Sequence, residues 1–156
     1  MASCFSRICL LVVVVTAVPV LRAQREKLPA DDLDVVEKNF PDAKKTDNGI
    51  RYIIQAEGEG DSPKAGDLVS LLYAGRLLNG TVFDQNVNRE HPMTFRLGRS
   101  RVIEGWEEIL PLMKRGERRL VIIPPELAYG MRGLPPRIPR EATLVFLIEL
   151  LDFKSE

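Results

Sequence analysis

The sequence predicts an α+β domain in which a five- to six-stranded antiparallel sheet wraps around one short helix. Three observations support this fold class. Apolar residues alternate with period two in several segments after Gly49, an Asn79-Gly80 pair marks a tight hairpin turn, and one amphipathic helix precedes the last strands. An antiparallel sheet curved over a single helix is the simplest arrangement that buries the apolar faces of both.

The first 23 residues have the features of a secretory signal peptide. Arg7 supplies a positive charge, and residues 8–20 form an apolar run that only Thr16 and Pro19 interrupt. That run is shorter than the ~20 residues that cross a membrane as a helix, so we expect its removal by cleavage after Ala23. An uncleaved membrane anchor is the alternative.

The amino-acid composition limits which cellular compartments and binding partners the sequence predicts. Both cysteines, Cys4 and Cys9, lie in the predicted leader, so the mature chain needs no disulfide and has no thiol chemistry. Without Arg7 and Arg22 the chain keeps 20 basic against 22 acidic residues, and no basic patch predicts a nucleic-acid partner. The C-terminal residues LLDFKSE carry no KDEL-like signal, so we expect the bacterial periplasm or secretion. We also expect a monomer that has no membrane contact after cleavage.

Residues 24–48 are polar and predict an N-terminal extension or linker with one short helix. Three apolar residues recur there at helical spacing: Leu33, Val36 and Phe40. Asp31 or Asp32 supplies a cap at the start of this helix, and Pro41 ends it. We assign no function to the segment and interpret it as a connector.

The segment 49–156 predicts one domain that begins with strands. Alternating apolar residues predict four of them: residues 50–55, 68–78, 81–84 and 94–97. In the second strand, Val69, Leu71 and Tyr73 share one face. Asn79 and Gly80 both tolerate positive φ and therefore turn the chain into the third strand. Residues 58–66 are a loop by composition, and residues 85–92 are polar and irregular.

The second half of this segment contains the helix and the last strands. The helix begins at Gly105, and Pro111 limits it to about two turns, ending near Leu110, because the proline ring clashes with the preceding turn. Its apolar face consists of Trp106, Ile109, Leu110 and Met113. Residues 117–123 and 143–153 predict strands, and residues 124–140 form a loop whose length is typical of functional or disordered segments. The inward residues of the last strand are Leu144, Phe146, Ile148 and Leu150.

Residue types exclude most catalytic machinery. The only histidine, His91, lies in a polar loop, where we expect it to be exposed, and no mature cysteine is present to complete a zinc site. No nucleophile elbow, P-loop or dinucleotide motif occurs. Glu107 and Glu108 point in different directions from a helix and are poor acid–base partners. An enzyme built on this chain therefore uses chemistry without a metal, nucleophile or cofactor, and prolyl isomerisation is one such reaction.

Six segments of residues 49–156 resemble the FKBP-type prolyl isomerase domain, in the family's order and with the expected spacing. They are LLYAG (71–75), NGTVFD (79–84), HPMTFRLG (91–98), VIEGWEE (102–108), PPELAYG (124–130) and IPREATLVFLIELL (138–151). The resemblance implies a peptidyl-prolyl cis-trans isomerase that acts on proline-containing polypeptides during the folding of exported proteins. A non-catalytic peptide-binding or holdase-chaperone module on the same fold is the alternative.

The resemblance also implies a substrate pocket. Its substrate-binding positions correspond to Tyr73, Phe83, Met93, Val102, Ile103, Trp106, Ile138 and Phe146. Trp106 forms the floor, the Ile103 backbone N–H holds a substrate carbonyl, and Ile138 covers the site from the long loop. Asp84 and Tyr129 occupy the two catalytic polar positions at the rim. Taken singly, such aromatic residues are more often plain core, so only their joint occurrence indicates a site.

Four residues depart from the family's pattern: Met93, Arg101, Leu134 and Arg137. Met93 replaces a common aromatic wall with a softer side chain. Arg101 and Arg137 place two cations near the mouth, which suggests a preference for acidic residues beside proline. The alternative is a pair of solvated surface arginines. These departures imply that macrolide inhibitors of the family bind weakly, and the resemblance implies no cofactor and no metal.

Overall fold

The computed structural model describes residues 26–155, so the predicted leader lies outside the described residues. The strands are β1 (Lys44–Lys45), β2 (Arg51–Ala56), β3 (Leu68–Leu77), β4 (Val82–Asn86), β5 (Met93–Arg96), β6 (Arg118–Ile123) and β7 (Leu144–Lys154). The helices are α1 (Ala30–Asn39) and α2 (Glu104–Ile109), with short 3₁₀ helices η1 (Leu110–Leu112), η2 (Pro125–Leu127) and η3 (Gly130–Arg132). Among residues 26–155, no helix is long and apolar enough to span a membrane.

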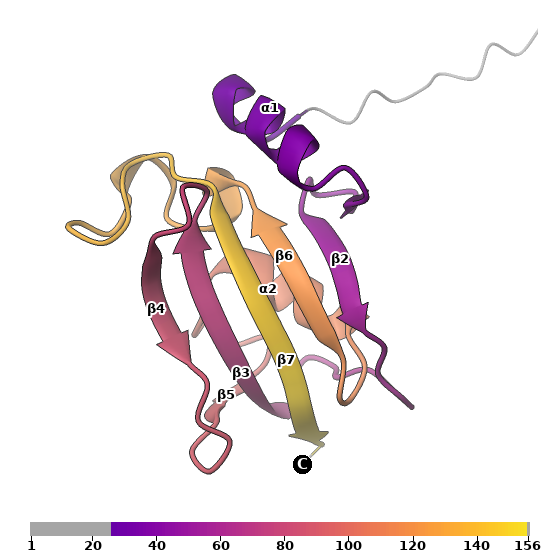
Figure 1. Ribbon diagram of the computed structural model, residues 1–156. Helices are drawn as coiled ribbons and strands as arrows, with labels where there is room; N and C mark the ends of the chain where they lie inside the picture. Colours follow the sequence, from indigo (N-terminus) through magenta and orange to yellow (C-terminus); the bar gives the residue numbers. More distant parts are fainter. Residues whose placement is uncertain (1–25, 156) are drawn as a thin grey trace, which may run out of the picture.

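The strands form one antiparallel sheet with helix α2 behind it (Figure 1). The strand order is β1-β2-β6-β7-β3-β4, and β5 pairs with β3 beside β4. Strand β3 is central, because β7 pairs with its whole length on one edge while β4 and β5 share the other. The predicted fold, an antiparallel sheet around one short helix, is confirmed.

Two strands differ from the expected pattern. Strand β4 continues through Gln85 and Asn86, which the sequence predicts as irregular, because these residues pair with β3. Strand β1 is an additional two-residue strand that pairs with β2, and its lysines show no apolar alternation that predicts it. With β1, the sheet of the described residues has seven strands, one more than the upper number expected.

The sheet separates two apolar clusters, one on each face. In β6, Val121 and Ile123 belong to the larger cluster, and the residues that alternate with them belong to the smaller one. The residues predicted to point inward from the helix and the last strand all lie in the larger cluster: Trp106, Ile109, Leu110, Met113, Leu144, Phe146, Ile148 and Leu150. The α-helix ends at Ile109, one residue before the end predicted from Pro111, and the chain continues as the 3₁₀ helix η1, which contains that proline.

Helix α2 lies directly on β6 because a glycine stands at the contact. A Cβ atom on Gly105 would lie 2.5 Å from Cγ2 of Ile123, which is closer than two carbon atoms approach without strong repulsion. The absence of a side chain therefore lets the start of the helix approach the sheet. This approach seats Trp106, which is 4% exposed, in the larger cluster.

The N-terminal extension packs as a layer on the other face of the sheet. Val36 of α1 is completely buried in the smaller cluster, and Asp32 Oδ2 accepts a hydrogen bond of 2.6 Å from Thr143 Oγ1. The helix is present where its periodicity predicts it, but the predicted aspartate cap is wrong. Pro29 occupies the N-cap position, and Asp31 and Asp32 lie in the first turn, where the helix dipole favours negative charge.

Candidate active site

Nine of the ten predicted site residues line one cavity of about 150 Å³, together with Arg101. The lining residues are Tyr73, Phe83, Asp84, Met93, Arg101, Val102, Ile103, Trp106, Tyr129 and Phe146. They come from β3, β4, β5 and β7, from α2 and the segment that leads into it, and from the long loop. The cavity therefore forms where the sheet curves over the beginning of the helix, and segments far apart in the sequence meet there.

The floor and walls of the cavity are aromatic rings packed edge to face. The Trp106 ring centroid lies 5.0 Å from that of Tyr73 and 5.2 Å from that of Phe146, with interplanar angles of 75° and 79°. Phe83 packs on Phe146 at 5.6 Å and 89°. Each such pair contributes about 0.5–1.5 kcal/mol beyond the area that it buries. The rings therefore hold one another in place and form a rigid apolar surface.

A glycine in β3 makes room for these walls. A Cβ atom on Gly75 would lie 2.6 Å from Cε1 of Phe146 and 2.7 Å from Cζ of Phe83. Any larger residue at this position pushes both rings away. Gly75 is not among the site residues predicted from the sequence, although a glycine inside a strand often marks a place where another group approaches the backbone closely.

The polar rim is organised around Asp84. Tyr73 Oη donates a hydrogen bond of 2.8 Å to Asp84 Oδ2, so a residue predicted as a wall also holds the carboxylate. Burial, together with this hydrogen bond, raises the pKa of Tyr73 from 10.0 to about 12. Burial also raises the pKa of Tyr129, and the negative charge of Asp84 adds to the effect. Both tyrosines therefore carry a hydroxyl proton throughout the neutral pH range.

Two donors at the cavity have no hydrogen-bond partner among residues 26–155. One is the backbone N–H of Ile103, the residue at the N-cap of α2, whose carbonyl accepts the Trp106 N–H at 2.9 Å. The other is the hydroxyl of Tyr129, which is 36% exposed. Both residues line the cavity, so a carbonyl group of a bound peptide has two protein donors within its walls.

The long loop differs from the expectation at Ile138. Its side chain is 1% exposed and belongs to the larger core cluster, and it does not line the cavity. The backbone groups of Leu134 and Ile138 exchange hydrogen bonds of 2.9 Å and 3.0 Å, which closes a tight turn and directs Ile138 inward. Leu134 and Arg137 lie on this turn and do not line the cavity either.

The exposed position predicted for His91 is confirmed.

The described part of the chain offers no evident metal centre. Among residues 26–155, no group of three or more histidine, cysteine or carboxylate side chains is placed to hold an ion. The side chains that line the cavity carry one carboxylate, that of Asp84, two phenolic hydroxyls and the guanidinium of Arg101. Its chemistry is therefore that of an apolar chamber with a few orienting groups.

Known proteins resemble this chain in sequence and in structure. Residues 60–151 match the sequence profile of the FKBP-type peptidyl-prolyl cis-trans isomerases. The chain is 42% identical over 109 residues to FK506-binding protein 1A of Aspergillus fumigatus, which covers 69% of this chain and 97% of that protein. It is 41% identical over 135 residues to peptidyl-prolyl cis-trans isomerase FKBP4 of Mus musculus, which covers 86% of this chain but only 28% of that longer protein.

A solved structure gives the same result. The crystal structure of a peptidyl-prolyl cis-trans isomerase from Pseudomonas syringae pv. tomato matches with a TM-score of 0.71 and 35% sequence identity. The match covers 83% of this chain and 94% of that one. The similarity therefore extends over nearly the whole of the solved chain.

Proposed function

Because the chain belongs to the FKBP-type peptidyl-prolyl cis-trans isomerase family, we propose that it accelerates cis-trans isomerisation of X–Pro bonds in polypeptides. One observation carries the proposal: a cavity with an aromatic floor and walls has Asp84, Tyr129 and the Ile103 N–H at its edge. Proline is the apolar, ring-shaped residue that such a chamber accommodates. The neighbouring peptide carbonyls then reach the donors.

The reaction is a rotation about one bond. The planar amide resists rotation with a barrier of ~18–20 kcal/mol, because rotation breaks the resonance between the carbonyl and the nitrogen. Without a catalyst an X–Pro bond takes on the order of tens to hundreds of seconds to isomerise. A catalyst must therefore bind the twisted amide more strongly than the planar one.

The aromatic walls supply this difference by excluding water. The planar amide is strongly dipolar and loses favourable hydration when it enters the cavity, whereas the twisted amide is less dipolar and loses less. Trp106, Tyr73 and Phe146 form the dry surface on which this difference develops. The rotation itself requires no proton transfer.

The polar groups orient the peptide during rotation. The Ile103 N–H and the Tyr129 hydroxyl hold peptide carbonyls, and both are free of protein partners among the described residues. Asp84, fixed by Tyr73, sets the electrostatic environment of the rotating carbonyl. Orientation by such groups lowers the entropy that is lost on reaching the twisted state.

Kinetic measurement on the full-length protein tests this function. We expect acceleration of X–Pro isomerisation in a short peptide, and we expect Asp84→Ala and Tyr129→Phe each to lower kcat/KM by about threefold to tenfold, the equivalent of one hydrogen bond. Tyr52→Phe and Asp34→Ala are matched controls, since neither residue lines the cavity. Binding of proline peptides without any acceleration would instead identify the chain as a peptide-binding or holdase module.

We further propose that the protein is exported and acts there as a monomer on folding polypeptides. The charged and apolar pattern of residues 1–23 supports export, and the absence of cysteine after Cys9 suits an oxidising compartment. Protein recovered from the exported fraction of an expressing bacterium is expected to begin at Gln24. A retained Met1 would contradict cleavage, and a dimer on size-exclusion chromatography would contradict the monomer.

Weak macrolide binding is part of the same proposal. Met93 and Arg101 both line the cavity, so two of the four positions that depart from the family's pattern alter the surface that such an inhibitor contacts. A flexible thioether and a cation give a less complementary wall than an aromatic ring. Titration calorimetry with a macrolide, compared with the Met93→Phe variant, is expected to show tighter binding by the variant.

A further inference from the structure

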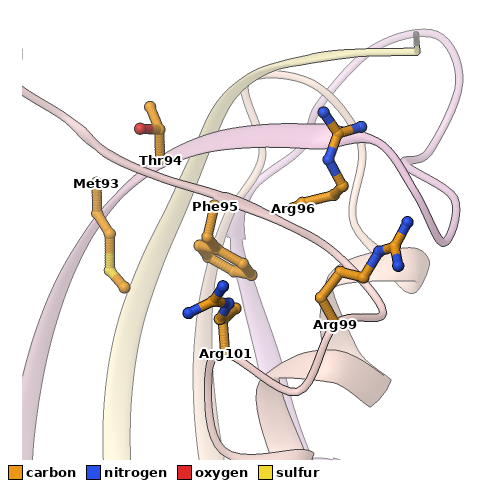
Figure 2. Close-up of a pocket in the computed structure, with 6 residues that line it drawn as sticks. All are labelled: Met93, Thr94, Phe95, Arg96, Arg99 and Arg101. Atoms are coloured by element: carbon orange, nitrogen blue, oxygen red, sulfur yellow. The ribbon is translucent and has the colours of Figure 1, made fainter.

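A second and larger cavity adjoins the aromatic one. It has a volume of about 730 Å³ and is lined by Met93, Thr94, Phe95, Arg96, Arg99 and Arg101 (Figure 2). Met93 and Arg101 line both cavities, so the two adjoin at these residues. The ring centroid of Phe95, which lines the larger cavity, lies 6.3 Å from that of Trp106, which lines the aromatic one. A chain that leaves the aromatic cavity past Met93 enters this groove.

The groove is cationic. Three of its six lining residues are arginines and none is acidic, and the whole segment 93–103 contains no acidic residue. Arg99 and Arg101 are exposed and form no ion pair within residues 26–155. Arg96 is held in place, because its guanidinium donates a hydrogen bond of 2.8 Å to the Gly66 carbonyl.

The loop that presents two of these arginines is fixed by a carboxylate of helix α2. Glu107 accepts hydrogen bonds from the backbone N–H groups of Gly98 and Ser100, at 2.5 Å and 3.0 Å. Ser100 adopts a left-handed conformation with φ of 51°, which turns the chain sharply between Arg99 and Arg101. The Glu107 carboxylate is therefore bonded to backbone N–H groups of this loop. Arg99 and Arg101 both project from the loop that these hydrogen bonds fix.

The shape of the groove fits an extended peptide. Strand β5 supplies four consecutive lining residues, and at ~3.3 Å per residue they span roughly 13 Å. Figure 2 shows Met93 and Phe95 on one side of this strand and Thr94 and Arg96 on the other, with Arg99 and Arg101 on the segment that follows. Three or four residues of an extended chain can therefore lie along the strand on the side of Met93 and Phe95, near the exposed Arg99 and Arg101.

We propose that this groove binds an acidic segment of the polypeptide substrate, next to the proline that occupies the aromatic cavity. Guanidinium groups bind carboxylates through paired hydrogen bonds, and the exposed Arg99 and Arg101 beside the groove favour aspartate and glutamate over neutral side chains. The inference rests on the proposed isomerase function and names the substrate class. Its determinants are Arg99 and Arg101, whereas the guanidinium of Arg96 is bound to the Gly66 carbonyl and Arg137 lines neither cavity.

The test uses peptides that share one X–Pro core and differ in three flanking residues, which are Glu, Gln or Lys. One set carries these residues before the core and the other carries them after it. With the full-length protein we expect, in one set, a kcat/KM for the Glu peptide about twofold to tenfold above that for the Gln peptide, the effect of two exposed ion pairs. About 1 M salt is expected to remove this difference. Equal values for the Glu and Gln peptides in both sets would overturn the proposal.

Variants assign the preference to the groove. The double variant Arg99→Gln/Arg101→Gln is expected to bring the Glu-to-Gln ratio of kcat/KM close to one. Arg137→Gln is the matched control, because it removes the same charge from an exposed position that lines neither cavity, and its ratio is expected to equal that of the parent protein. A ratio that survives in the double variant, or disappears in the control, would contradict the assignment.

Direct binding separates this inference from the isomerase function. Fluorescence anisotropy with the labelled Glu and Gln peptides measures Kd whether or not the bond isomerises. Tighter binding of the Glu peptide that depends on Arg99 and Arg101 supports the groove even if neither peptide is turned over, in which case only the isomerase function has failed. Equal Kd values alongside efficient turnover would refute the groove alone.

Discussion

At the scale of single residues, Tyr73 has two roles, one for its ring and one for its hydroxyl group. Its ring forms an edge-to-face contact with Trp106, and its hydroxyl donates to the carboxylate of Asp84. The first contact shapes the floor of the cavity, and the second fixes the only acidic group that lines it. Removing the hydroxyl alone therefore isolates the orientation of Asp84 from the packing of the ring.

Tyr73→Phe is expected to lower kcat/KM by about threefold while changing the free energy of unfolding by less than about 1 kcal/mol, because one exposed hydrogen bond is lost and the ring remains. Peptide isomerisation and denaturant titration measure the two quantities. Tyr52→Phe is the control, since Tyr52 packs beneath the Arg119 guanidinium and outside the cavity. Unchanged turnover in Tyr73→Phe would mean that the orientation of Asp84 is irrelevant to the rate.

The pKa values of the two cavity tyrosines predict the pH dependence. Folding raises the pKa of Tyr73 from 10.0 to about 12 and raises that of Tyr129, so the folded protein holds these protons more strongly than the unfolded chain. The resulting stability is complete below a pH of about 10 and is lost as the pH rises from about 10 towards 12. Denaturant titrations across this range are expected to show the loss, and Tyr73→Phe is expected to reduce it.

The catalytic rate is expected to be independent of pH between about 6 and 8, because bond rotation transfers no proton and both hydroxyls stay protonated. The measurement is kcat/KM for a neutral X–Pro peptide at constant ionic strength. A bell-shaped profile in this interval would indicate a general acid or base in the chemical step.

At the scale of secondary-structure elements, the site forms where β3 and α2 lie unusually close to their neighbours. Strand β3 lies against the rings of Phe83 and Phe146 at Gly75, and helix α2 lies against Ile123 at Gly105. Both contacts depend on a missing side chain. The two glycines therefore determine how near the sheet and the helix bring the walls and the floor of the cavity.

Gly75→Ala is expected to destabilise the protein by about 1–3 kcal/mol, because the added methyl group overlaps both wall rings. It is also expected to lower kcat/KM, since displaced rings admit water to the cavity. Denaturant titration and the peptide assay measure the effects, with Ser70→Ala as a control on the same strand, outside the cavity. Wild-type stability in Gly75→Ala would show that the rings move aside without cost.

At the scale of the whole molecule, the sheet carries separate structures on its two faces. The aromatic cavity belongs to the face that α2 covers, and α1 packs on the opposite face. The extension before Gly49, predicted as a connector, therefore adds buried surface to the domain. Its helix stabilises the sheet without contributing a residue to the cavity.

Val36→Ala is expected to lower the free energy of unfolding by about 1.5–3 kcal/mol, because the side chain is fully buried between α1 and the sheet. Val35→Ala, on the same helix but 38% exposed, is expected to have little effect. Activity well below the melting temperature is expected to match the parent protein for both. A large loss of activity in a folded Val36→Ala variant would show that packing on the α1 face of the sheet affects the cavity on the opposite face.

Much of the fold could be predicted from the sequence because the information is local. Alternation in the last strand placed Leu144, Phe146 and Ile148 in the core, and Pro111 set the end of the helix. Strand residues that depend on pairing with a neighbouring strand were not predicted. Gln85 and Asn86 are strand residues only because β3 lies beside them, and the two lysines of β1 only because β2 does.

The site shows the same division. The resemblance of short motifs to a known family named the residues that line the cavity, because each motif keeps its place in the strand or turn that carries it. Ile138 was assigned to the cavity as well, but the turn closed by Leu134 buries it in the core. The groove lined by Arg96 and Arg99 was not predicted, because the position of the loop after β5 depends on its hydrogen bonds to Glu107.

By itself, the sequence determined the fold class, the family and the identity of the cavity's rings and polar groups, because periodicity and motif order are properties of the chain alone. Only the tertiary structure decided which of these groups touch. The hydrogen bond from Tyr73 to Asp84 and the rings that meet over Gly75 each involve separate elements of the sheet. Contacts of this kind depend on how the sheet curves and pairs, which no local pattern encodes.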